Sequence, residues 1–316
     1  MTALRYIQAD AQKGEGEAMS TLLTMLGCRY PIIQGPIGNM NSPRMVAEVS
    51  EAGAYGMLAL GFIDDIEEIR RLIREVRALT DKPFGANVVL LNPKVKEILT
   101  LLAEEGIKTV TTSVGRPDKI YPFLHELGLQ GLHVVLSLPH ALKAAEAGAD
   151  GLVVVGSEAG GLRSRNPESS TMVLVPLVAD HVSLPIVAAG GIADARGYRA
   201  AFALGAQGVQ IGTRFLASTE STIPEKWKQM IVESTDGGTT LIPVQKGLLT
   251  RVIITPWLKS LLARQDVDLE EAINYRAGLQ AWERGDYEHA LAGAGQVSAL
   301  IREIKPIRDI IAEMVA

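Results

Sequence analysis

The sequence contains a single cysteine, Cys28, among 316 residues. One cysteine excludes an internal disulfide and a cysteine-based metal cluster, and it suits a reducing compartment. No apolar run reaches the roughly 18 residues that a membrane span needs, and the polar residues 1–18 lack the apolar stretch of a signal peptide. We therefore expect a cytoplasmic protein with a loose extension over residues 1–18 and without a metal site.

An excess of positive charge is also missing. Lys and Arg total 31 against 36 Asp and Glu, for a net charge of −5, which argues against nucleic-acid binding. What the chain has in quantity is hydrophobic residues, at 47 %, and glycine, at 31 residues. This composition is sufficient for one large α/β domain, alone or with a smaller lobe.

From Pro31 to about Ser218, short apolar runs alternate with helical periods. The runs predict eight buried parallel strands, at residues 31–35, 53–60, 83–91, 108–114, 131–138, 150–157, 185–191 and 208–213. Eight βα units predict a closed (β/α)8 TIM barrel over residues 19–220. A doubly wound open sheet is the rival, but it usually has fewer strands and a glycine fingerprint after the first one. The stretch QGPIGNM at that place lacks GxGxxG.

After residue 220 the alternation stops. Residues 221–316 contain amphipathic helical periods joined by polar or glycine-containing turns. A closed barrel has no free edge for a further strand, so we expect this helical segment to pack over the barrel mouth or along its outside. It would serve there as a lid or substrate lobe, or only as helical packing. Its apolar helix faces are also compatible with a homodimer.

Two of the predicted strands end in glycine-containing turns, Gly190-Gly191 and Gly212-Thr213. They follow the seventh and eighth strands, where TIM barrels often hold a phosphate group. Glycine lets backbone N–H groups approach an anion closely, and the start of the next helix adds its dipole. Asp194 is placed to cap the helix after the seventh strand. The two turns together predict a ligand with a phosphate group.

Polar residues interrupt three other strand ends. Gln34 ends the first strand, Asn87 lies in the third, and Glu158 follows the sixth, next to Gly160-Gly161. Buried amides are costly unless they are paired, so Asn87 needs a partner inside the mouth. Each residue alone could be a structural hydrogen-bonding group. Together they form a ring at one mouth, which suits a flat, polar-edged cofactor with a phosphate tail.

Five stretches carry a resemblance to a known family: PIIQGPIG, KPFGANVVLL, GSEAGG, PIVAAGGIADARG and GAQGVQIGTRFLAS, in this order and spacing. They resemble the nitronate monooxygenases, once called 2-nitropropane dioxygenases, a family that includes the FMN-dependent enoyl-ACP reductase II enzymes. The similarity is strong over about residues 26–220. In the tail, AGAGQVSALI at 292–301 resembles the family's late glycine-glutamine segment.

The resemblance implies an FMN-binding TIM barrel. It places one group of residues along or beside the flavin ring and another at the FMN phosphate. The implied cofactor residues are Gln34, Gly35, Pro36, Asn87 and Gly161 for the ring, and Gly190, Gly191, Gly212 and Thr213 for the phosphate, with Ile37 and Gln210 as further cofactor-binding residues.

One position departs from the family pattern. Members typically read AGGH, with the histidine as base or proton donor near the flavin, whereas this chain has Leu162 there. Nearby Arg163 and Arg165, with Glu158, are candidates for contact with an anionic substrate group. None of the five histidines is expected at the mouth, and His133 is expected at the bottom of the barrel.

The missing histidine sets the expected reaction. A positioned base is typically worth 10²–10⁴-fold, whereas an already anionic nitronate needs none. We therefore predict an FMN-dependent oxidoreductase that oxidises an anionic nitronate, with O2 reoxidising the flavin. Two alternatives stay open: an NAD(P)H-dependent reductase of enoyl thioesters or quinones, and a non-catalytic barrel that binds flavin or another phosphorylated ligand.

Overall fold

The computed structural model describes residues 21–38, 42–61, 63–245 and 247–316. The predicted extension over residues 1–18 lies outside them. Within the described residues, eight parallel strands form one sheet in the order β1-β9-β8-β6-β5-β4-β3-β2. These strands are β1 (Ile32–Gln34), β2 (Gly56–Ala59), β3 (Phe84–Val89), β4 (Thr109–Ser113), β5 (Gln130–Val135), β6 (Gly151–Val155), β8 (Ile186–Ala189) and β9 (Gly208–Ile211).

The two edges of this sheet, β1 and β2, meet and close it into a barrel. Ile33 forms a parallel bridge with Tyr55, and the Gln34 N–H donates to the Tyr55 carbonyl at 2.9 Å. The predicted TIM barrel and all eight predicted strands are therefore confirmed. The seventh and eighth barrel strands carry the labels β8 and β9, because the short strand β7 (Gly161–Ser164) lies outside the barrel sheet.

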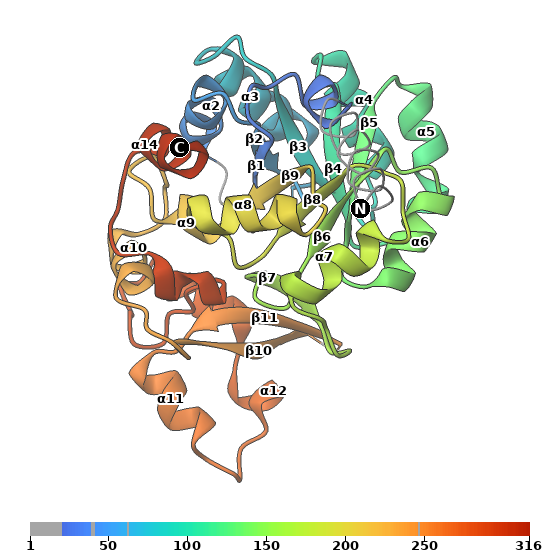
Figure 1. Cartoon of the computed structure of the whole chain (residues 1–316). Helices are drawn as coiled ribbons and strands as arrows, with labels where there is room; N and C mark the ends of the chain where they lie inside the picture. Colours follow the sequence, from blue (N-terminus) through green and yellow to red (C-terminus); the bar gives the residue numbers. More distant parts are fainter. Residues whose placement is uncertain (1–20, 39–41, 62, 246) are drawn as a thin grey trace, which may run out of the picture.

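Helices surround the barrel (Figure 1). They begin at the caps that the sequence suggests: Ser42 accepts from the Met45 N–H, with proline at the first helical position, and Asp194 accepts from the Arg196 N–H. The helices of this layer are α2 (Pro43–Glu51), α3 (Ile66–Arg77), α4 (Val95–Glu104), η1 (Pro117–Lys119), α5 (Tyr121–Glu126), α6 (Leu138–Glu146), α7 (Thr171–Ala179), α8 (Ala195–Ala203) and the short α9 (Thr213–Leu216).

The last helix of the chain, α14 (Ile307–Val315), completes this outer layer. It packs between α8 and α2, because the helix that follows β9 is only four residues long. Ile310 and Ile311 of α14 are buried in the same apolar cluster as Met45 of α2 and Ile211 of β9. The end of the tail therefore belongs to the core of the barrel.

The tail also contains a β-hairpin, which the sequence analysis did not predict. β10 (Thr239–Gln245) and β11 (Leu248–Ile253) are antiparallel, and β11 pairs with β7, so a three-stranded sheet lies beside the barrel. The remaining tail elements are helical, as expected: α10 (Glu225–Val232), α11 (Pro256–Leu262), α12 (Leu269–Ala272), α13 (Tyr275–Gln280) and η2 (Gln296–Leu300). No helix in the described part of the chain has the length and apolar character needed to cross a bilayer.

His133 of β5 is buried between the barrel and its helices. Its Nδ1 lies 2.8 Å from the Thr112 hydroxyl, and burial, with a smaller contribution from His140, lowers its pKa to about 4. The unfolded histidine takes up a proton near pH 6.5. Unfolding therefore binds a proton between these values, and stability falls as the pH falls from 6.5 to about 4.

We predict that His133→Gln reduces the amount of unfolding free energy that the protein loses at low pH. Urea unfolding of the parent and of the variant at pH 7.5 and pH 4.5 measures it. The parent should lose on the order of 3 kcal/mol more than the variant between the two pH values. Equal losses in the two proteins would contradict the burial argument.

Candidate active site

The two glycine-containing turns lie side by side at the carboxyl ends of β8 and β9. The strands pair in register, Ala188 with Val209 and Ala189 with Gln210, so the turns that follow them are neighbours. Gly190 and Gly191 have φ values of +99° and +75°, a region that strongly favours glycine. At Gly212, by contrast, an added Cβ would meet no atom within 4 Å, so the backbone there faces open space.

A segment of the tail packs against the turn after β9 and the loop after β6. The Gly295 N–H donates to the Thr213 hydroxyl at 2.9 Å, and the Gln296 N–H donates to the Glu158 carbonyl at 2.9 Å. A Cβ on Gly295 would approach the Gly160 nitrogen to 3.0 Å, so the contact requires glycine. The tail therefore touches both the β6 loop and the turn after β9.

The first-strand residues lie at the seam that closes the barrel. Gln34 Oε1 accepts from the Met57 N–H at 3.4 Å, and the Gly35 N–H donates to the Ile211 carbonyl at 2.7 Å. A Cβ on Gly35 would lie 3.2 Å from that carbonyl, so glycine allows this close approach. Pro36 and Ile37 follow, both half-buried, and Ile37 packs against an apolar cluster of the tail.

Asn87 has the partner that its burial demands. Its Nδ2 donates to the Thr111 hydroxyl at 2.9 Å, and the Ser113 hydroxyl donates to its Oδ1 at 3.4 Å. The hydroxyls of β4 were missed in the sequence analysis, although Thr109, Thr111 and Ser113 alternate in a strand that should be apolar on its inner side. This alternation of hydroxyl residues is visible in the sequence and indicates where the partners of Asn87 lie.

Gln210 of β9 carries an unpartnered polar atom. Its Oε1 is buried and has no hydrogen-bond partner among the described residues. A buried acceptor without a donor is costly. Since Gln210 lies one residue before the end of β9, this acceptor is available to a ligand N–H group at the mouth.

The three candidate substrate contacts are already engaged within the protein. The Glu158 carboxylate accepts from the Thr171 N–H and hydroxyl at the start of α7. Arg163, 1 % exposed, donates to Glu168 at 2.8 Å and to the Gly156 carbonyl. Arg165 forms a surface ion pair with Glu270. Each side chain is accounted for by contacts within the protein.

Leu162, at the family's histidine position, lies in the middle of β7. It is half-buried and pairs with Thr250 of β11. The next residue toward the mouth, Gly161, is exposed, has a φ of +76°, and has open space where a Cβ would be. The small antiparallel sheet therefore sets the position of Leu162.

Arg251 of β11 is a residue that sequence reasoning missed, because its strand was not predicted. It lies opposite Gly161, is 7 % exposed, and donates to the Ser157 carbonyl at 3.0 Å. Burial, and then the nearby Arg163, lower its pKa, and its Nε has no partner among the described residues. Arg251 thus ties the small sheet to the loop that carries Glu158 and Gly161.

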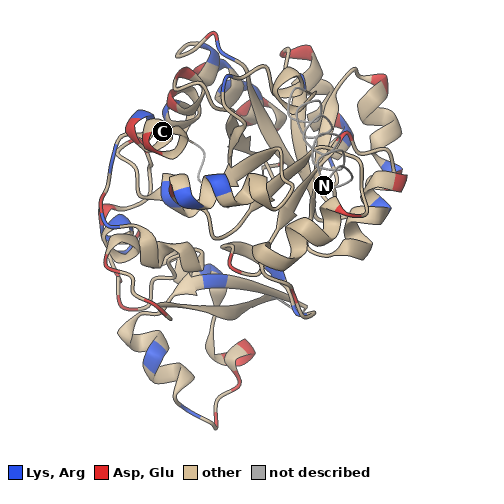
Figure 2. Cartoon of the chain, viewed as in Figure 1, with Lys and Arg blue, Asp and Glu red and all other residues tan. Residues whose placement is uncertain are grey.

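Charged side chains are absent from the barrel strands. Figure 2 shows Lys, Arg, Asp and Glu on the helices, the loops and the tail, whereas all eight barrel strands are free of them. The described residues also contain no group of three or more His, Cys, Asp or Glu side chains that could hold a metal ion. The strands thus supply amides and hydroxyls to the mouth, and no carboxylate or amine.

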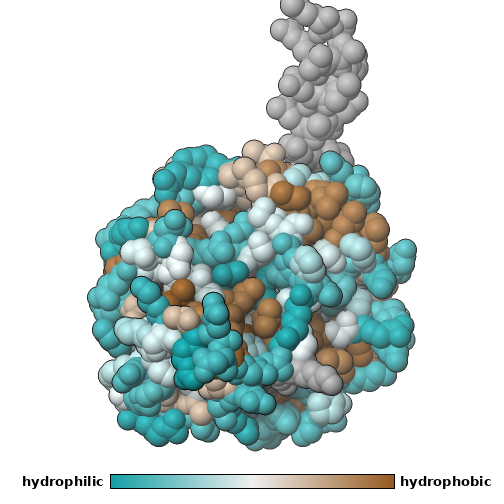
Figure 3. Space-filling model, turned by 90° about the horizontal axis from the view of Figure 1, so that it is seen from below, coloured by the Kyte–Doolittle hydropathy of each residue, from teal (hydrophilic) through white to brown (hydrophobic). Residues whose placement is uncertain are grey.

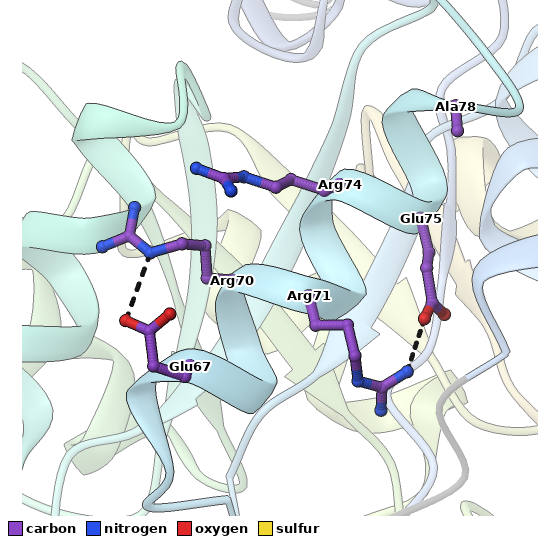
Figure 4. Close-up of a pocket in the computed structure, with 6 residues that line it drawn as sticks. All are labelled: Glu67, Arg70, Arg71, Arg74, Glu75 and Ala78. Carbon is purple, nitrogen blue, oxygen red and sulfur yellow. Dashed lines mark hydrogen bonds and ion pairs between the residues drawn. The ribbon is translucent and has the colours of Figure 1, made fainter.

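A charged surface hollow lies elsewhere, on one face of α3 (Figure 4). Its arginines are neutralised by neighbouring acids: Arg70 bonds Glu105 at 2.8 Å, Arg74 reaches the same carboxylate at 3.2 Å, and Arg71 pairs with Glu75. These residues form a solvated helix face, and the hollow has no connection to the strand ends.

The fold is a closed (β/α)8 barrel with uncharged strands, and its glycine turns follow the last two strands, where TIM barrels frequently hold a phosphate group. Comparison with known proteins identifies the family. The sequence model described as nitronate monooxygenase matches residues 19–316. The chain belongs to the nitronate monooxygenase family and is an enzyme, an oxidoreductase of a flavin-dependent type.

Individual relatives agree with this assignment. The nitronate monooxygenase of Paraburkholderia phytofirmans is 31 % identical, covering 93 % of each chain. The (3aS,4S,5R,7aS)-5-hydroxy-7a-methyl-1-oxo-octahydro-1H-indene-4-carboxyl-CoA dehydrogenase of Rhodococcus jostii is 35 % identical over 77 % of this chain and 69 % of its own. Among solved structures, FabK from Thermotoga maritima superposes with a TM-score of 0.83 at 36 % identity, covering 93 % of this chain and 94 % of its own.

Proposed function

We propose that the protein binds FMN at the carboxyl ends of its strands and oxidises an anionic alkyl nitronate, with O2 as the final electron acceptor. The observation that carries the proposal is the pair of neighbouring glycine turns, with open space at Gly212. Adjacent backbone N–H groups and the start of a helix favour a phosphate. The unpartnered Gln210 Oε1 provides an acceptor for the imide N–H of a flavin ring.

The chain's own residues have distinct tasks in this proposal. Gly190, Gly191, Gly212 and Thr213 would hold the phosphate, and Gln34, Gly35, Pro36, Ile37, Asn87, Gly161 and Gln210 would lie along or beside the ring. When bound, FMN supplies the electron-accepting and oxygen-reactive chemistry. The barrel strands bring no carboxylate to the mouth, and the nearby Glu158 carboxylate is held by the Thr171 N–H and hydroxyl. The tail segment at Gly295 and Gln296 would cover the side of the Thr213 turn.

Leu162 restricts the substrate to one already ionised. A leucine cannot remove the α-proton of a neutral nitroalkane, and the neighbouring Glu158 carboxylate is committed to the start of α7. A nitronate anion arrives without that proton, so no base is needed. The proposed substrate is therefore the nitronate and not its conjugate acid.

The test is anaerobic mixing of the FMN-loaded protein with ethyl nitronate, followed by admission of air. We expect loss of the oxidised-flavin absorbance, then its return with consumption of O2. Neutral nitroethane should give little change on the same timescale. If the nitronate does not reduce the flavin but NADH or NADPH reduces it rapidly, the proposal is overturned.

We predict that Leu162→His raises the rate with neutral nitroethane by about 10²-fold or more, because it restores a titratable nitrogen at this position. The rate with ethyl nitronate should change much less. Leu162→Asn, which adds polarity without a base, is the matched control. If the histidine variant behaves as the asparagine variant does, Leu162 does not explain the substrate restriction.

A second candidate function is redox chemistry on an acyl thioester with a pyridine nucleotide as co-substrate. It is supported by the Rhodococcus jostii relative, whose name gives a carboxyl-CoA substrate. Reduction of the flavin by NADPH, and turnover of a CoA thioester in place of a nitronate, would favour it. A protein that binds FMN tightly but turns over neither class would be a flavin-binding module.

A further inference from the structure

Two exposed apolar side chains lie next to each other at the carboxyl ends of β3 and β4. Leu91 is 70 % exposed and Val114 is 37 % exposed. The Leu91 N–H donates to the Val114 carbonyl at 3.1 Å, and the Leu90 N–H donates to the Ser113 carbonyl at 2.8 Å. The pairing of the two strands thus continues past their ends and holds both residues together.

This pair continues the wall of the candidate site. Asn87 and Val89 lie two residues apart in β3 and therefore on one side of the strand, and Leu91 follows in the turn that the Asn92 N–H closes by donating to the Val89 carbonyl at 3.0 Å. Val89 packs at the mouth, where a Cβ on Gly61 would lie 2.5 Å from its Cγ2. On β4, Ser113, which bonds Asn87, directly precedes Val114. Leu91 and Val114 therefore form an apolar rim just beyond the ends of the two strands that carry Asn87 and Ser113.

The backbone at Val114 is strained, and yet the residue at this position is apolar and β-branched. Val114 has a φ of +49° and is the one non-glycine residue with positive φ in the part of the chain that the structure describes. A β-branched residue is strongly disfavoured there, whereas asparagine and glycine are tolerated. Val114 remains 37 % exposed at this position, and strain of this kind concentrates at ligand sites.

We propose that Leu91 and Val114 form a binding surface for the aliphatic part of the substrate, which makes them determinants of chain-length preference. The surface lies at the end of the wall that Asn87 begins, so a small head group at the ring would extend its hydrocarbon tail across the rim. The preference among nitronates rests on the proposed function, but contact between the rim and an aliphatic chain does not require that the substrate be a nitronate.

The experiment compares the parent with Leu91→Ser and Val114→Asn across straight-chain primary nitronates from two to six carbons. In the parent, kcat/KM should rise about two- to fourfold for each added methylene, as apolar burial predicts. Each variant should reduce this rise to less than about 1.5-fold per methylene. Leu79→Ser is the control: Leu79 is 54 % exposed and follows α3, shortly before the amino-terminal end of β3 and away from the rim at its carboxyl end. Its variant should keep the parental dependence.

Two further measurements distinguish failure of the rim proposal from failure of the proposed function. Straight-chain carboxylates of two to eight carbons, titrated into the FMN-loaded protein, should raise the thermal midpoint more as the chain lengthens, and the rim variants should lose this trend. Val114→Asn alone should leave the midpoint unchanged or raise it, because strain is relieved. If no nitronate is oxidised but the carboxylate trend depends on the rim, only the proposed function fails. If neither series depends on chain length, or the rim variants match the parent, the rim proposal is overturned.

Discussion

Gly212→Asp is expected to abolish useful FMN affinity while leaving the fold intact. The new carboxylate enters the open space beside the proposed phosphate position, and juxtaposed like charges cost several kcal/mol. The dissociation constant for FMN should therefore rise at least about 100-fold. The fold should tolerate the change, because Gly212 has a φ of −109° and caps α9, and aspartate is a favoured N-cap residue. Fluorescence titration of the apoprotein with FMN measures the effect.

A matched variant controls for added charge. Ser260→Asp places the same charge on the exposed face of α11, and it should leave FMN affinity unchanged. The thermal midpoint of the Gly212→Asp apoprotein should stay within about 2 °C of the parent, since surface changes usually cost less than about 0.5 kcal/mol. If the folded Gly212→Asp protein binds FMN with unchanged affinity, the FMN phosphate does not bind beside Gly212.

Glu168→Gln is expected to lower the free energy of unfolding by about 3–5 kcal/mol. Glu168 is the carboxylate partner of Arg163, and their side chains are 9 % and 1 % exposed. Removing one partner of a buried ion pair leaves the other charge uncompensated. Because Arg163 also donates to the Gly156 carbonyl, the loss should spread to the loop after β6. Urea unfolding at pH 7.5 measures it.

The adjacent ion pair provides the comparison. Arg165 and Glu270 are about half exposed, so Glu270→Gln should cost only about 0–1 kcal/mol. The double variant Arg163→Met with Glu168→Leu should recover most of the lost stability, since apolar replacements remove both charges together. Equal losses for the two glutamine variants would mean that burial does not set the strength of these pairs.

The barrel was predictable from the sequence because its signals are local. Each strand is a short apolar run, and caps such as Ser42 and Asp194 mark where helices begin. The adjacency of the glycine turns then follows from consecutive parallel strands. These features need only neighbours in the chain and the regular geometry of βα units.

The tail hairpin and its contacts were not predictable in the same way. The stretch around Gly247 is rich in β-branched residues, but Pro243 interrupts the first of its two runs. β11 is stabilised by β7, 84 to 90 residues earlier in the chain. The partners of Arg163 and Glu158 depend on the same long-range packing. The sequence indicated the types of side chain near the mouth, but not which of them are committed to internal pairs.

The position of α14 has a consequence for how this protein is assembled and altered. The last barrel strand ends at Ile211, but the barrel lacks its eighth outer helix until α14 (Ile307–Val315) has docked against α2 and α8. Folding of the barrel thus depends on a helix that begins 96 residues after the end of its last strand, since β9 ends at Ile211 and α14 begins at Ile307. An exchange of residues 221–316 between relatives must therefore carry an α14 that fits α2 and α8 of the recipient barrel, so sequence changes in this segment are coupled to the stability of the barrel.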